Sequence, residues 1–236
     1  METIAQSSSQ IKQRALVGLI FVRIAPTISV ITGFALKAGL IAAFVFIFTK
    51  LWIFGLPAYW YLKIEGGQRS YSTPQNGGWM VSTLLGIGMA IVIGIAYFLL
   101  GDLVIRSEDL AEILEPFGLT VPWKLAIGIL FWIFINSVLE EYVFRWFITS
   151  KLETLVGGKW RPILLSAAIF TLHHTIALAF FIDPLGNAIA SLGVFIGGVI
   201  FSWLYVQYRS VWVAWVAHAI ADVAIFAIAW QLIVGF

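Results

Sequence analysis

Residues Trp79–Gly101 read WMVSTLLGIGMAIVIGIAYFLLG, a run of 23 residues without a charged side chain. An α-helix rises about 1.5 Å per residue, so this run is long enough to cross the hydrocarbon core of a bilayer, which is about 30 Å thick. Strict alternation of polar and apolar residues is absent, which argues against the strands of a membrane β-barrel. Because lipid offers no partner to free backbone groups, the run predicts a transmembrane helix.

Similar apolar stretches fill much of the remaining chain. The other candidates are Ala38–Tyr61, Val121–Ile148, Ile163–Ile182, Ala188–Tyr208, Val211–Phe236 and a weaker one, Ala15–Phe34, which contains an arginine and a proline. Of the 236 residues, 61% are hydrophobic and 11% are charged, whereas about 25% of the residues in soluble domains are charged. We therefore predict an all-α fold, a polytopic membrane helix bundle with six or seven transmembrane helices.

Charge and cysteine content exclude several classes of function. The formal net charge of +2 is too small to indicate nucleic acid as a partner. The chain has no cysteine, which excludes thiol nucleophiles, thiolate metal sites and disulfides. Basic residues gather in alternate connections, including the expected loop Lys151–Arg161, whereas Asp102–Thr120 is acidic and shows the apolar spacing of a short surface helix. The positive-inside rule places the basic connections in the cytoplasm.

Ionisable side chains within apolar spans are costly, so they normally face the bundle interior and mark a pathway or a reaction site. Those that stand out are Glu140, Glu141, Arg145, His173, His174, His218 and Asp222. Counted from the nearest basic connection at 1.5 Å per residue, Glu140, His174 and His218 all lie roughly 13–20 Å deep. Three helices are therefore expected to bring a carboxylate and two imidazoles to a similar depth from one side.

Spacing along each helix suggests how these side chains pair. Glu141 and Arg145 are four residues apart and can form an ion pair on one helix face. Glu140 points about 100° away from Glu141, so its carboxylate is available for another task. His218 and Asp222 are also four residues apart, and the aspartate could orient the imidazole or contact the same water or ion.

A carboxylate with two imidazoles is suited to activating water. The carboxylate accepts a proton, while the imidazoles hold the water directly or through a divalent metal such as zinc. The metal ligands would then be His174 and His218, with His173 as the alternative to His174. Attack on an amide also requires stabilisation of an oxyanion, which Arg145, a histidine or a metal could supply. The zincin motif H-E-x-x-H is absent.

Three short motifs follow one another along the chain, one on each expected helix. They are Glu-Glu-x-x-x-Arg from Glu140, Phe-x-x-x-His from Phe170 to His174, and His-x-x-x-Asp from His218. In this order they resemble the CPBP family, also called Abi proteins, which includes CAAX prenyl endopeptidases of the Ras-converting type and bacteriocin-processing enzymes. The resemblance covers about Val121–Phe236 and implies an intramembrane protease with a four-helix catalytic core that opens toward the cytoplasm.

The resemblance also implies a role for each motif residue. Glu140 is the base that activates water, His174 and His218 hold that water or a metal, and Asp222 assists them. The second glutamate and the arginine of the first motif support the site and the substrate backbone. His173 fits the shorter spacing Phe-x-x-His, but the family motif favours His174. Whether members of the family require a metal is an open question, so the cofactor stays open.

Several expectations about the whole protein follow from the resemblance. We expect accessory helices and a connector in residues 1–120, and the catalytic core in residues 121–236. The expected substrate is a peptide or protein at the membrane; a prenylated C-terminal peptide, a bacteriocin leader and an unrelated membrane protein stay open. We expect a multi-pass protein of a prokaryotic cell membrane. The alternative functions are a transporter or proton relay and a non-catalytic scaffold or immunity protein of the same fold.

Overall fold

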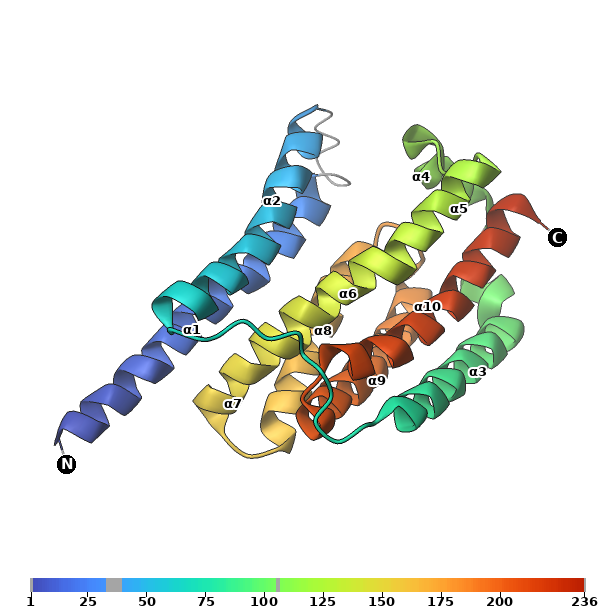
Figure 1. The fold of residues 1–236 in the computed structure, drawn as a ribbon. Coiled ribbons are helices and arrows are strands. Elements are labelled where there is room, and N and C mark those ends of the chain that lie inside the picture. Colours follow the sequence, from blue (N-terminus) through green and yellow to red (C-terminus); the bar gives the residue numbers. More distant parts are fainter. Residues whose placement is uncertain (1, 33–39, 105–106, 236) are drawn as a thin grey trace.

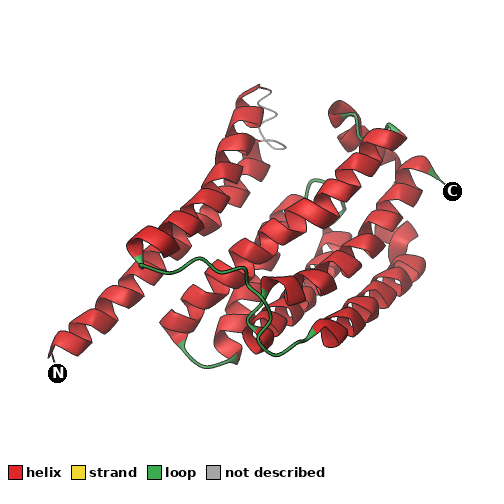
Figure 2. Cartoon of the chain, in the orientation of Figure 1, coloured by secondary structure: helices red, strands yellow, loops and turns green. Residues whose placement is uncertain are grey.

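The computed structural model describes residues 2–32, 40–104 and 107–235, and these form helices and loops with no strand among them (Figure 2). The principal helices are α1 (Glu2–Val30), α2 (Leu40–Tyr59), α3 (Trp79–Val104), α4 (Ser107–Leu114), α5 (Pro122–Phe131), α6 (Ser137–Glu140), α7 (Ser150–Val156), α8 (Trp160–Leu178), α9 (Pro184–Tyr208) and α10 (Val211–Val234). The described π-helical segments include η2 (Trp60–Ile64), η4 (Trp132–Asn136) and η5 (Glu141–Thr149). The all-α prediction is confirmed.

Five helices of the described part are long and apolar enough to cross a membrane. They are Trp79–Gly101, Pro122–Val156, Trp160–Leu178, Pro184–Tyr208 and Val211–Val234. This confirms a polytopic membrane bundle. The two remaining candidates, Ala15–Phe34 and Ala38–Tyr61, include residues 33–39, which lie outside the described residues, so the total of six or seven spans stays a prediction.

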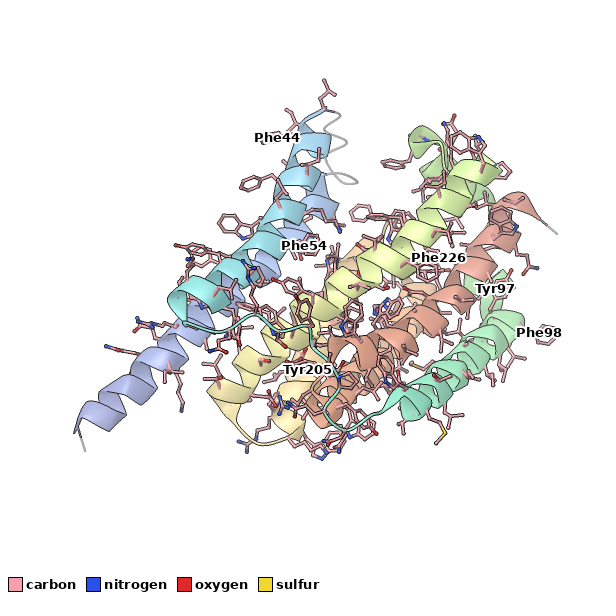
Figure 3. The ribbon with its side chains drawn as sticks, viewed as in Figure 1. Phe44, Phe54, Tyr97, Phe98, Tyr205 and Phe226 are labelled. Atoms are coloured by element: carbon pink, nitrogen blue, oxygen red, sulfur yellow. The ribbon has the colours of Figure 1, made fainter. Side chains whose placement is uncertain are left out.

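Pro122–Val156 forms one helical rod of 35 residues, in which η4 and η5 join α5, α6 and α7. In Figure 1 this rod runs diagonally through the molecule, with α8, α9 and α10 beside it and α3 against α10. The pair α1 and α2 lies on the opposite side of the rod from α3. Figure 3 shows Phe98 projecting from α3 away from the bundle; its side chain is 87% exposed, as a lipid-facing residue would be.

Small residues let the site-bearing helices approach closely. A Cβ atom at Gly198 of α9 would lie 3.2 Å from Cα of Ala167 in α8. A Cβ atom at Gly86 of α3 would lie 3.1 Å from Cα of Ala217 in α10. Such contacts are typical of membrane helix packing, where close backbone approach takes the place of a hydrophobic driving force.

The basic end of the rod differs from the expectation. Lys151–Arg161 was expected to be a loop, but the helix continues through Val156 and α8 begins at Trp160. Polar side chains in this last turn find partners: Lys151 forms an ion pair with Glu65, and Glu153 accepts two hydrogen bonds of 2.8 Å from Arg209. A rod of 35 residues is about 50 Å long, so its end extends beyond the hydrocarbon and can carry these charges.

Two connections also bear on the architecture. The acidic segment contains α4 and the short 3₁₀ turn Glu115–Phe117, which confirms a short helix there. The segment 65–78 leads from the end of η2 to α3 across the base of the bundle (Figure 1). It is tied to the α9–α10 turn, because Gln75 N donates to Tyr208 O (3.2 Å) and Val211 N donates to Ser72 Oγ (2.9 Å).

Candidate active site

Glu140 ends α6 in the middle of the long rod, between the two π-helical segments. Its Oε2 atom lies 3.8 Å from Nε2 of His174 in α8 and 3.8 Å from Nε2 of His218 in α10. Three helices therefore direct three polar side chains toward one point. A separation of 3.8 Å is too long for a direct hydrogen bond and is suited to a shared water molecule.

His218 is held on both sides of its ring. Its Nδ1 atom lies 2.8 Å from Oε1 of Glu141, a carboxylate that is fully buried. Its Nε2 atom lies 3.6 Å from Oδ1 of Asp222 as well as facing Glu140. Phe201 of α9 stacks on the imidazole with ring centroids 4.6 Å apart and an interplanar angle of 16°. Glu141 thus orients the ring from the far nitrogen, and Asp222 lies on the side that faces Glu140.

His174 is oriented by the backbone of its own helix. Its Nδ1 atom lies 2.9 Å from the carbonyl oxygen of Phe170, which can only accept a hydrogen bond. The proton of the neutral ring therefore belongs on Nδ1, and Nε2 is left as an acceptor facing Glu140. Phe170, the first residue of its motif, also packs against the imidazole, with ring centroids 4.2 Å apart.

His173 points elsewhere. It lines a cavity of about 30 Å³ that also contacts Glu140, and a cavity of about 250 Å³ whose other walls come from α1, α8 and Phe144. Its Nδ1 atom is buried without a hydrogen-bond partner among the described residues. The structure thus brings His174, and not His173, to the point shared by Glu140 and His218.

Arg145 lies deep in the protein and does not reach that point. Its Nε atom donates to Oε2 of Glu141 (3.1 Å), and both side chains are fully buried. The guanidinium carbon lies 4.5 Å from the ring centroid of Phe170 and 5.4 Å from that of Phe201, so aromatic faces contact the cation. Glu141 therefore bridges Arg145 to His218.

Two residues next to Glu140 were missed in the sequence. Asn136 of η4 donates from Nδ2 to Oε1 of Glu140 (2.7 Å), and Lys50 of α2 donates to Oδ1 of Asn136 (3.1 Å). The four-residue spacing between Asn136 and Glu140 could have indicated their contact. A lysine in the middle of the apolar stretch Ala38–Tyr61 is the signal that could have revealed Lys50.

The donor chemistry of the two histidines resembles that of metal ligands, because each imidazole gives its other nitrogen to a carboxylate or a carbonyl. The arrangement does not fit a metal, however. Nitrogen and oxygen ligands lie about 2.0–2.2 Å from zinc, which places the ligand atoms of a tetrahedral site about 3.3–3.6 Å apart, somewhat closer than the 3.8 Å found here. Among the described residues, no group of three or more His, Asp and Glu side chains is arranged to hold an ion. We therefore derive no step through a metal.

Comparison with protein families connects this geometry to a known class. Residues 122–224 match the family model described as type II CAAX prenyl endopeptidase Rce1-like. No curated protein and no solved structure matched the chain. The resemblance seen in the motifs is confirmed: residues 122–224 form an Rce1-like domain. This similarity over part of the chain indicates an intramembrane endopeptidase of the CAAX protease class, whose substrates are membrane-associated proteins.

Proposed function

We propose that the protein hydrolyses a peptide bond of a membrane-associated substrate with a water molecule that Glu140 activates. The observation that carries this proposal is the position of Oε2 of Glu140, which lies 3.8 Å from Nε2 of both His174 and His218. A water molecule between these three atoms would be held by groups from three helices. Its hydrogen bonds would fix its orientation before the substrate arrives, and pre-orientation of this kind accounts for a large share of enzymatic rate enhancement.

In the proposed reaction, Glu140 both accepts a proton and returns it. As the water oxygen bonds to the carbonyl carbon, a water proton passes to Oε2 of Glu140. The carboxylic acid then gives this proton to the amide nitrogen as the carbon–nitrogen bond breaks. The products are a new carboxyl terminus and a free amine, and the carboxylate of Glu140 is regenerated.

The remaining motif residues are proposed as supports. Glu141 holds His218 in place through Nδ1, and Arg145 holds Glu141, so neither needs to touch the substrate. Asp222 lies on the Nε2 side of His218, where it can accept a hydrogen bond from the bound water. A protonated His218 or His174 is the group available to donate to the oxyanion, because Arg145 is enclosed by Glu141 and aromatic rings.

The polar cluster also favours hydrolysis over transport. A proton relay or ion pathway needs titratable groups distributed along the route through the bilayer, whereas these groups converge on one carboxylate. We further propose that the site opens on the cytoplasmic side, which the basic connections support. We propose a CAAX-type protein as the substrate. Whether the protein prefers a prenylated substrate is decided by the experiment below.

The test is cleavage of a farnesylated CAAX-type peptide by the purified protein in liposomes, compared with the same peptide without the prenyl group. We expect Glu140→Gln to lower kcat by about 10²- to 10⁴-fold, because glutamine cannot accept the water proton. Glu115→Gln is the matched control, since Glu115 is exposed in the acidic connection. Unchanged cleavage by Glu140→Gln would overturn the proposal.

Two further outcomes refine this test. Equal cleavage of both peptides would retain the protease and remove the prenyl preference. Absence of cleavage by the wild type, together with proton flux across the liposome membrane that Glu140→Gln abolishes, would replace the protease with a proton relay.

A further inference from the structure

Lys50 connects the N-terminal helices to the proposed catalytic centre. It lies in α2, outside the residues 122–224 that match the family. Its ammonium group donates to Oδ1 of Asn136 at 3.1 Å, across 86 residues of chain. A charged side chain in an apolar helix is costly in a bilayer and usually marks a functional contact.

The contact with Lys50 determines which way the Asn136 amide faces. An ammonium group can only donate, so it requires the amide oxygen on its side. The amide nitrogen must then face the other way, where it donates to Oε1 of Glu140 at 2.7 Å. If the amide turned over, its oxygen would face a carboxylate and its nitrogen would face an ammonium group, and both contacts would be repulsive.

The orientation of Glu140 depends in turn on this amide. With Oε1 held by Asn136, the other carboxylate oxygen, Oε2, is the one that faces His174 and His218. The cavity of about 30 Å³ beside these groups is lined by Lys50, Asn136 and Glu140. A cavity of this size with several polar walls can hold a water molecule. The contact between Lys50 and Asn136 therefore borders a site where water can bind next to Glu140.

We infer that Lys50 and Asn136 are positioning residues for Glu140, and that α2 is therefore part of the catalytic centre. This inference rests on the proposed function. Lys50 acts through Asn136 and not on the substrate, so its loss should slow the chemical step and leave substrate binding unchanged.

The test uses the full-length protein and the farnesylated CAAX-type peptide. We expect Lys50→Met to lower kcat by about 10- to 100-fold, the loss associated with a small displacement of a catalytic group, while KM stays within about twofold. Lys50→Arg keeps the charge and the donors and should recover most of kcat. Lys63→Met is the matched control, because Lys63 lies in η2 on the same helical element and is exposed.

A double-mutant cycle separates positioning from general stability. Asn136→Leu should lower kcat as much as Lys50→Met, and the double variant should lose no more than either single variant, since both break one chain of contacts. Thermal unfolding of each variant in detergent identifies any variant that fails to fold. If Lys50→Met is such a variant, Asn136→Leu, which leaves α2 intact, carries the test alone.

The outcomes are distinct from those of the proposed function. Unchanged kcat in Lys50→Met, a loss confined to KM, or additive losses in the double variant would overturn the positioning role while Glu140→Gln stays inactive. If Glu140→Gln itself retains cleavage, the proposed function fails and this inference fails with it.

Discussion

The α1–α2 pair and the helices of the Rce1-like domain are held in the bundle by different kinds of contact. In the domain, Glu141, Arg145 and His218 form a buried polar chain across two helices. The α1–α2 pair is anchored through apolar side chains, among them Leu19 and Ile53, which belong to the same hydrophobic cluster as residues of the rod. Lys50 is one place where the α1–α2 pair contacts a polar side chain of the domain, that of Asn136.

The family match therefore covers only part of the proposed site, because Lys50 lies outside residues 122–224. The match covers Glu140, His174 and His218, the three groups proposed to hold the water molecule. The groups that hold them can come from any helix that packs alongside. Variants in each region can therefore test whether the domain supplies the reacting groups while the α1–α2 pair helps to position them.

The largest loss of activity is expected at His174, and its neighbour His173 provides the comparison. His174→Ala should lower kcat by about 10²- to 10⁴-fold, because it removes one of the three groups around the proposed water. His173→Ala should change kcat by only a few-fold, since His173 faces the cavities toward α1 and α2. Steady-state cleavage of the same peptide measures both. A greater loss from His173→Ala would reverse the assignment and give the shorter motif spacing the functional role.

The next effect concerns the buried polar chain of the domain. Glu141→Leu leaves the guanidinium group of Arg145 buried without its carboxylate and should cost about 3–5 kcal/mol of stability. The double variant Glu141→Leu/Arg145→Met removes both charges and should recover most of this loss in thermal unfolding. It should stay inactive, because His218 has lost the acceptor of its Nδ1 proton. If the double variant were as unstable as Glu141→Leu, the unpaired charge on Arg145 would not be the cause of the lost stability.

The smallest effect measures the attachment between the two regions. Tyr142 of the rod donates a hydrogen bond of 3.1 Å to the carbonyl oxygen of Phe54 in α2. Tyr142→Phe removes only this hydroxyl and should lower the free energy of unfolding by about 0.5–1.5 kcal/mol, with kcat nearly unchanged. Tyr71→Phe is the control, since Tyr71 is largely exposed. A large loss of kcat would mean that the α1–α2 attachment itself controls the catalytic geometry.

Much of the bundle could be predicted from the sequence because lipid leaves few choices. An uncharged run such as Trp79–Gly101 has to form a helix, and α3 covers these residues and continues to Val104. The partnership of Glu141 with Arg145 also followed from local spacing, since residues four apart share a helix face. These predictions depend on contacts within one helix or on composition.

The contacts between helices were harder to predict. The bond from Glu141 to His218 spans 77 residues, and no local spacing indicates which carboxylate takes which nitrogen of the ring. Lys50 was overlooked among the charges in the spans, and its partner Asn136 lies 86 residues away. The continuation of the rod past Ile148 was missed because Lys151 and Glu153 were assigned to a loop, although partners from other segments allow both to sit on a helix.

The π-helical segments on either side of Glu140 have a consequence for the evolution of this rod. A π-helical turn accommodates one more residue than an α-helical turn, so η4 and η5 set the angular phase of every side chain beyond them. If the helix around a one-residue insertion or deletion before Arg145 kept its conformation, the downstream side chains would rotate by about 100° and Arg145 would turn away from its pocket. Length in this segment is therefore under the same constraint as residue identity, and tolerated indels should be confined to the loops.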